Sequence, residues 1–158
     1  MTTQQISLFG ANQELLIQLV TANVRLLVVG GVAVRFYVPT RPVDDLDILV
    51  ESTLENAEKV MDVLLRLRLT PNFSVVDLAR PNVHLPIKGY HYADILTPPT
   101  GFDFADAYAR ASVGCVTHNS EFALVRVTAI DALLALIRRT PDLDEKRRND
   151  IAVLEALL

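Results

Sequence analysis

The sequence predicts an α/β (α+β) protein with a mixed central β-sheet flanked by helices. Two observations carry this prediction. Short and nearly all-apolar runs, such as residues 24–29, have the length and composition of buried strands. They alternate with longer segments whose apolar residues recur at helical spacing, as in residues 54–67. A chain in which strands and helices alternate in this way packs its helices against a sheet.

In the N-terminal half, the residues at the element ends support this alternation. Asn12 is a suitable N-cap for a first helix, and Gly30-Gly31 permits a tight turn between a strand and a short helix. Pro39 ends that short helix, and Ser52 or Thr53 caps the next long one. The expected elements are a helix over 11–22, a strand over 24–29, a helix over 32–38, a strand over 44–51 and a helix over 54–67.

The second half begins with β signals and ends with helices. His118-Asn119-Ser120 has the composition of a hairpin turn, and Thr128 is expected to cap a helix in which Asp131 completes a capping box. The expected elements are strands over 73–76, 83–87 and 91–96, a helix over 102–111, a hairpin of 112–117 with 121–126, and helices over 129–139 and 141–158. No linker interrupts the chain. We therefore expect a single domain over 1–158, with a core at about 11–127 and a C-terminal helical pair at about 128–158.

Composition limits the possible functions. A length of 158 residues with 51% hydrophobic content suits one globular domain. The formal net charge of −4 argues against a broad nucleic-acid-binding surface. Cys115 is the only cysteine, which excludes a disulfide within the chain. Charges interrupt every apolar run and the N-terminus lacks the pattern of a signal peptide, so we expect a cytoplasmic protein without membrane association.

Two carboxylates lie one residue apart in the strand expected over 44–51. Alternate side chains of a strand share a face, so Asp45 and Asp47 are expected to point to the same side. Their repulsion is costly unless a cation or a proton lies between them. The Gly30-Gly31 turn precedes this strand and heads a helix, whose free N–H groups could hold a phosphate. The pattern therefore indicates a divalent metal near a phosphate site.

The succession of Gly30-Gly31, Arg41 and Asp45-Leu46-Asp47-Ile48 resembles the signature of the nucleotidyltransferase superfamily, whose members include polymerase β-like enzymes. Within it, the segment resembles the small minimal nucleotidyltransferases of the AbiEii toxin-like branch. The resemblance covers residues 24–51 well and residues 94–158 more loosely. It implies a nucleotidyltransferase fold with C-terminal helices.

The resemblance also implies a set of site residues. Asp45, Asp47 and Asp94 would hold Mg²⁺ or Mn²⁺, with Asp94 also serving as the catalytic base toward the acceptor hydroxyl. Asp77 and Asp103 are the rival candidates for the third acid. The residues expected to contact the triphosphate of the NTP substrate are Gly30, Gly31, Arg41 and Lys146. Two alternatives stay open here: Arg41 either pairs with Asp44 or reaches a phosphate, and Lys146 either binds phosphate or lies on a solvated helix face.

By this resemblance, the chain would be a metal-dependent nucleotidyltransferase that moves an NMP from an NTP to a hydroxyl of a protein or RNA acceptor such as tRNA. It would belong to a toxin–antitoxin or phage-defence system and bind a cognate antitoxin or toxin. An oligomer is also compatible with this resemblance. The alternative is a catalytically reduced protein that acts as a binding or regulatory, antitoxin-like module. Gly31 and Val43 favour the alternative, because many active relatives have Ser and Thr there.

The histidines and the cysteine carry no predicted role. His84, His91 and His118 are widely spaced and show no metal-ligand pattern, and Cys115 is expected to pack in a strand.

Overall fold

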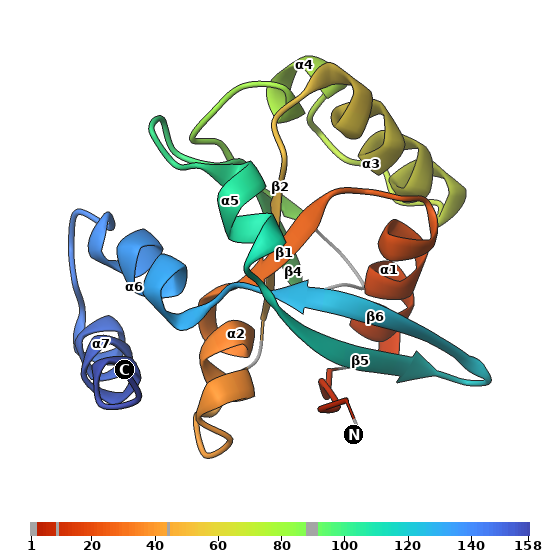
Figure 1. The fold of residues 1–158 in the computed structure, drawn as a ribbon. Helices are drawn as coiled ribbons and strands as arrows, with labels where there is room; N and C mark the ends of the chain where they lie inside the picture. The colour runs from red at the N-terminus through yellow and green to blue at the C-terminus, as the bar shows by residue number, and fades with distance from the viewer. Residues whose placement is uncertain (1–2, 9, 44, 88–91) are drawn as a thin grey trace.

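A computed structural model describes residues 3–8, 10–43, 45–87 and 92–158 of the chain. Its N-terminal half contains α1 (Gly10–Thr21), β1 (Leu26–Val29), α2 (Gly30–Tyr37), β2 (Leu46–Val50), α3 (Leu54–Arg66) and α4 (Val75–Leu78). The rest contains β3 (His84–Ile87), β4 (Ala93–Leu96), α5 (Phe104–Ala109), β5 (Ser112–His118), β6 (Glu121–Val127), α6 (Ile130–Arg138) and α7 (Glu145–Glu155). Figure 1 shows the sheet crossing the molecule, with α6 and α7 together on one side.

The strands form one mixed sheet in the order β3-β4-β2-β1-β6-β5. The β2–β4 and β1–β6 pairs are parallel, whereas β1–β2, β3–β4 and β5–β6 are antiparallel. This arrangement confirms the predicted mixed sheet flanked by helices. The predicted hairpin is present as β5 and β6, although His118 belongs to β5 and lies opposite Glu121, with Asn119 at a positive φ of 56° in the turn.

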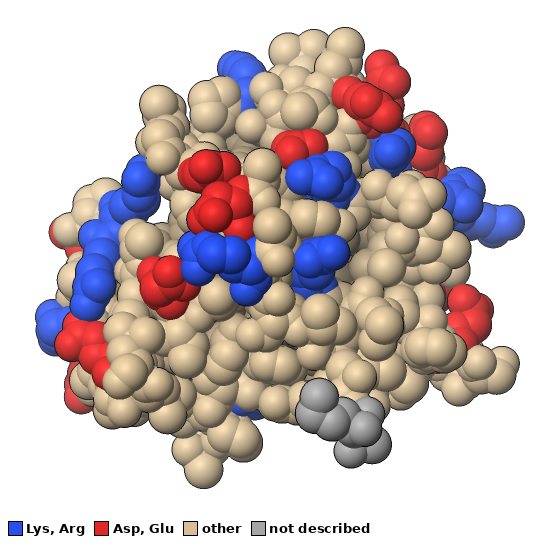
Figure 2. Space-filling model, in the orientation of Figure 1, with Lys and Arg blue, Asp and Glu red and all other residues tan. Residues whose placement is uncertain are grey.

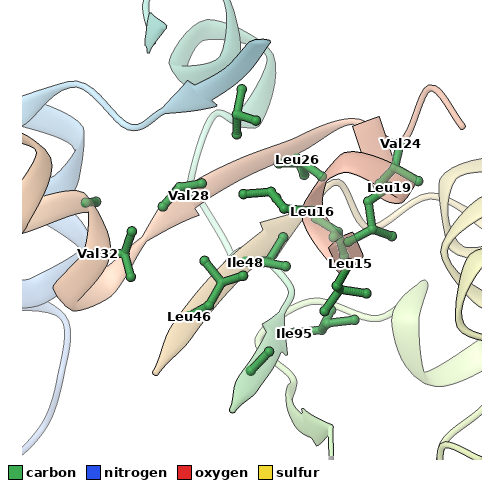
Figure 3. Packing of buried hydrophobic residues seen from close by; sticks show 14 of the residues in the cluster. Leu15, Leu16, Leu19, Val24, Leu26, Val28, Val32, Leu46, Ile48 and Ile95 are labelled. Atoms are coloured by element: carbon green, nitrogen blue, oxygen red, sulfur yellow. The ribbon is translucent and has the colours of Figure 1, made fainter. Parts of the chain in front are cut away.

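One face of the sheet carries the larger part of the core. Val28 and Ile48 are partners in the β1–β2 ladder, and both are fully buried. Figure 3 shows Leu15, Leu16 and Leu19 of α1 packed toward this face, next to side chains of β1, β2 and β4. Burial of such apolar surface is the main free-energy gain on folding. The opposite face is covered by α5 and α6, whose Phe104, Ala107 and Ala132 pack on Leu27, Val29 and Leu49.

The strand β1 is apolar along its whole length because it is buried on both sides. Leu26 and Val28 face the α1 side, and Leu27 and Val29 face the α5 side. The same alternation places Asp47 of β2 on the α5 side, with Leu49. The last residue of β1, Val29, is the ladder partner of Asp47. The glycine turn after β1 and the acidic start of β2 are therefore neighbours.

Most predicted elements are present, with ends that differ by a few residues, but the strand expected over 73–76 is wrong. That segment enters the short helix α4, because Ser74 and Asp77 form a capping box that stabilises a helical turn. The strand expected over 91–96 is present as β4, although its first residue lies outside the described residues.

Two predicted caps are also wrong, and so is the predicted start of the last helix. Asn12 lies within α1, where its Nδ2 donates a hydrogen bond to the Tyr92 carbonyl oxygen. The Thr128 hydroxyl donates to the Val28 carbonyl oxygen, so Ala129 begins α6 without a side-chain cap. Finally, α7 begins later than predicted, after Asp144, whose side chain accepts from the Arg147 N–H. Among the described residues, every helix is too short or too polar to cross a membrane.

Candidate active site

Asp47 and Asp94 lie side by side on neighbouring parallel strands. They are direct partners in the β2–β4 ladder, so their side chains stand on the same face of the sheet. Asp45 precedes β2 and is exposed at the rim. All three predicted acids line one cleft, together with Gly30 and Gly31. The structure thus brings the acids of two separate chain segments together, as the resemblance implies.

Neither rival for the third acid lies in the cleft lining. Asp77 is engaged in the capping box of α4, and the Asp103 side chain caps α5 by accepting from the Asp106 N–H. Asp94 is therefore the acid that the fold presents beside Asp47.

The Gly30 backbone is pressed against the carboxylate of Asp47. Gly30 has a φ of +65°, a conformation that side chains other than glycine seldom adopt. A β-carbon there would lie 2.1 Å from the Asp47 Oδ2 atom. Position 30 therefore requires glycine for two reasons, and α2 begins directly beside the acids.

Asp47 titrates far above the usual range of a carboxyl group. Burial, followed by repulsion from Asp94, raises the pKa of Asp47 to about 6. His84 and Arg147 act in the opposite direction on this pKa, and Asp45 adds to the increase. An ionised Asp47 is therefore costly in the metal-free protein, and a bound cation would remove much of that cost.

The donor set fits Mg²⁺ held jointly with a nucleotide. No three His, Cys, Asp or Glu side chains of the described residues form a ready-made metal cage. Mg²⁺ is usually bound by only one or two carboxylates, with substrate phosphates and water completing its octahedron. The adjacent carboxylates of Asp47 and Asp94 match that requirement in number and in ligand type.

Gly31 and Val43 are in contact. A β-carbon at position 31 would lie 2.6 Å from the Val43 Cγ2 atom and 3.3 Å from Arg41 Nη1. The two positions at which this sequence departs from the resemblance are therefore coupled in space. The Val43 methyl group fills the room that a side chain at position 31 would need.

Arg41 has a partner that sequence reasoning did not consider. Its Nε and Nη2 donate to the two carboxylate oxygens of Asp150 at 2.8 and 2.9 Å. Both side chains are largely buried, at 12% and 8% exposure, so the pair joins the loop before β2 to α7. The Asp150 carboxylate holds the pKa of Arg41 above its ordinary value. The predicted alternative partner, Asp44, lies outside the described residues. Arg41 also lines the cleft, and a role in phosphate binding stays a prediction.

Basic side chains from α7 and from the end of α6 also line the cleft. They are Lys146 and Arg147 of α7, and Arg139, which directly follows α6. The Lys146 side chain is exposed, and a role in phosphate binding stays a prediction. Arg147 lowers the pKa of Asp47, so its charge acts on the acidic centre. Figure 2 shows a row of basic side chains, with acidic ones beside it, over the side where α6 and α7 lie. The sequence shows a cluster of Lys and Arg after Glu145, which indicates a basic surface. It does not show that Arg147 of this cluster lies near Asp47.

His84 is a cleft residue that sequence reasoning missed. Its Nε2 atom lies 2.9 Å from the Asp94 Oδ2 atom. His84 is two residues from Pro86, the ladder partner of Asp94, so the contact runs diagonally between β3 and β4. The spacing of the histidines gave no signal, because the contact depends on which strands become neighbours.

The cleft has a volume of about 680 Å³, within the range of small-molecule sites. The acids and the glycine turn share its lining with apolar side chains of the sheet and of α6, namely Val29, Leu49, Leu96, Leu133, Leu136 and Ile137. The cleft therefore combines phosphate-directed groups with apolar surface.

No family model matches the sequence, and no curated protein is significantly similar to it. A solved structure of ANT(2")-Ia in complex with adenylyl-2"-tobramycin is similar in fold, with a TM-score of 0.55 and 16% identity over 94% of this chain and 90% of that one. An antigenic nucleotidyltransferase-like protein from Paracoccidioides brasiliensis matches with a TM-score of 0.45 and 13% identity, over 96% and 79% of the two chains. The six-stranded mixed sheet with its flanking helices is thus the nucleotidyltransferase fold that the acid and glycine motifs indicate.

Proposed function

We propose that this protein is a metal-dependent nucleotidyltransferase, which transfers an NMP from an NTP to a hydroxyl group. The observation that carries the proposal is the pairing of Asp47 with Asp94, directly beside the Gly30 turn and inside a cleft. Nucleotidyl transfer needs charge neutralisation and positioning more than covalent chemistry from the protein. A pair of carboxylates can hold the metal that neutralises charge, and the start of a helix beside them can position the phosphates.

The acidic, glycine and basic residues named above have distinct roles in this proposal. Asp45, Asp47 and Asp94 hold Mg²⁺ or Mn²⁺, which when bound neutralises charge on the phosphates of the NTP. The backbone N–H groups at Gly30 and Gly31 face the triphosphate, and Lys146 and Arg41 contribute positive charge. Arg147, which already acts on Asp47, belongs with them.

Asp94 acts as the base. Its carboxylate takes the proton of the acceptor hydroxyl as that oxygen forms a bond to the α-phosphorus. The bond between the α-phosphorus and the bridging oxygen breaks, and pyrophosphate leaves with that oxygen. Asp94 is less enclosed than a core residue, with 27% of its side chain exposed, so an acceptor can approach it.

The acceptor is a hydroxyl of a protein or an RNA, in the setting of toxin–antitoxin or phage-defence systems. The resemblance of residues 24–51 to the AbiEii toxin-like branch supports this choice. A small polyhydroxylated molecule is a second candidate, because the ANT(2")-Ia chain, of which 90% is covered by the similarity, is described with an adenylylated tobramycin.

A catalytically reduced binding module is the alternative, and the contact of Gly31 with Val43 favours it. That contact leaves no room for a phosphate-binding hydroxyl at position 31. Such a module would bind a toxin or antitoxin partner, or a second copy of itself, without transferring a nucleotide.

Titration calorimetry with Mn²⁺ or Mg²⁺ and ATP or CTP tests the metal and nucleotide site. We expect metal-dependent binding in the wild type and its loss in Asp47→Asn. Asp62→Asn changes an exposed acid on α3 and should bind like the wild type. Absence of metal-dependent nucleotide binding in the wild type would refute the proposal that the protein is a metal-dependent nucleotidyltransferase.

Transfer is tested separately, by incubating the protein with an NTP labelled at the α-phosphate and with total RNA, total protein or aminoglycosides. Label appearing on any acceptor supports the enzyme and identifies its substrate class. Nucleotide binding without transfer to any of them supports the binding module.

A further inference from the structure

We propose that His84 is a positioning residue for Asp94. In this role the imidazole holds one carboxylate oxygen of Asp94, so that the other stays available to the metal and the acceptor hydroxyl. The inference rests on the proposed function, because it gives Asp94 the role of metal ligand and base. It assigns a task to a residue for which the sequence offered none.

Three neighbouring strands bring the acids and His84 together. Asp47, Asp94 and His84 come from β2, β4 and β3, and their side chains form a row across one face of the sheet. Asp47 flanks Asp94 on one side, while the His84 Nε2 atom lies 2.9 Å from Asp94 Oδ2 on the other. Asp94 thus stands between a carboxylate that repels it and an imidazole that can donate to it.

Among the residues that the structure describes, no side chain other than His84 is paired with the Asp94 carboxylate. The residue directly opposite it on β3 is Pro86, whose ring offers no hydrogen-bond donor. The contact with His84 uses only Oδ2. Without the imidazole, the carboxylate would be free to rotate away from Asp47 to lower their mutual repulsion.

The position of His84 favours a functional role over a structural one. Its side chain is 60% exposed and lies on the edge strand β3, so it contributes little to the core. It nevertheless lines the cleft with the acids. Partners that orient a metal-binding carboxylate or imidazole commonly change metal affinity by about 10–100-fold when removed.

The test measures Mn²⁺ binding by electron paramagnetic resonance, in the presence of an ATP analogue with a methylene group between the α- and β-phosphorus atoms. The variants are His84→Ala, His84→Gln and Asp94→Asn, with His118→Ala as the matched control at the opposite end of the sheet. We expect His84→Ala to weaken Mn²⁺ binding by at least about tenfold. His84→Gln, whose amide can donate at similar reach, should restore most of it, and His118→Ala should bind like the wild type.

The double variant His84→Ala/Asp94→Asn distinguishes positioning from a general effect. If His84 acts through Asp94, adding His84→Ala to Asp94→Asn weakens Mn²⁺ binding no further. Wild-type affinity in His84→Ala would overturn the inference and leave the proposed function standing. An additive loss in the double variant would also overturn it. A wild type that binds no Mn²⁺ with the analogue would remove the proposed function and this inference together. Urea unfolding of each variant confirms that it is folded.

Discussion

The α-carbon of Gly30 lies against the carboxylate of Asp47, so closely that a β-carbon at position 30 would be 2.1 Å from Asp47 Oδ2. The contact links the end of β1 to the start of β2 through a residue with a positive φ. It fixes one wall of the cleft, because the acid cannot move toward the turn. The helix α2 begins at this glycine, which is earlier than the predicted start at residue 32.

Gly30→Ala should therefore eliminate metal-dependent nucleotide binding. The methyl group forces the Asp47 carboxylate to move, and the positive φ costs about 1–2 kcal/mol of folding free energy for a residue with a side chain. Gly101→Ala is the matched control, because Gly101 has a φ of +89° but its β-carbon would meet nothing closer than 3.9 Å. It should lose similar stability in urea and keep nucleotide binding. Equal nucleotide binding in the two variants would contradict the close contact.

A side chain at position 31 should be tolerated only when Val43 is replaced by a smaller residue. Gly31→Ser places a β-carbon 2.6 Å from Val43 Cγ2, and we expect a loss of about 1–3 kcal/mol from overpacking. Gly31→Ser/Val43→Ala removes the colliding methyl group and should recover part of that loss. Urea unfolding of both single variants and the double variant gives the coupling free energy. Strict additivity would show that the two residues do not compete for space.

The free energy of unfolding of the metal-free protein should depend on Asp47 between pH 4 and 7. The pKa of Asp47 is about 6 when folded, against an ordinary value of 3.8. The folded state therefore holds the proton more tightly, and ionised Asp47 costs up to about 3 kcal/mol at pH 7, a cost that disappears as the pH falls through 6 toward 4. Asp47→Asn should be the more stable protein at pH 7, and its advantage should shrink on acidification. Urea unfolding in EDTA measures the difference, with Asp62→Asn expected to follow the wild type.

The fold and the acidic core of the site follow from local patterns. Asp45 and Asp47 lie within the strand expected over 44–51, and the Gly30-Gly31 turn comes shortly before it. The period of the strand and the turn-forming glycines therefore sufficed to predict that these residues are neighbours. Asp94 required the resemblance, because a single acid in a strand has no signature of its own. The structure places it beside Asp47 through the parallel β2–β4 pairing.

The parts that sequence could not supply depend on contacts between distant segments. His84 reaches Asp94 only because β3 becomes the edge neighbour of β4. Arg41 meets Asp150, which lies 109 positions later in the chain. The helix α4 was missed for a local reason, since Ser74 and Asp77 form a capping box that apolar neighbours such as Val75 and Val76 obscured. Strand order and ion pairs between distant segments are thus the features that local sequence patterns do not predict.

Arg41→Met should be strongly destabilising, because it leaves the Asp150 carboxylate buried without its partner. Removal of one member of a buried ion pair typically costs about 3–5 kcal/mol, whereas replacement of both by apolar residues costs far less. Arg41→Met/Asp150→Leu should therefore unfold at a higher urea concentration than Arg41→Met alone. Arg110→Met breaks the exposed ion pairs with Asp106 and Asp131 and serves as the control, with an expected loss of about 1 kcal/mol per pair or less. If Arg41→Met is no more costly than Arg110→Met, the Arg41–Asp150 pair does not hold α7 in place. If the double variant is folded but binds nucleotide poorly, the charge of Arg41 serves the phosphates as well as the fold.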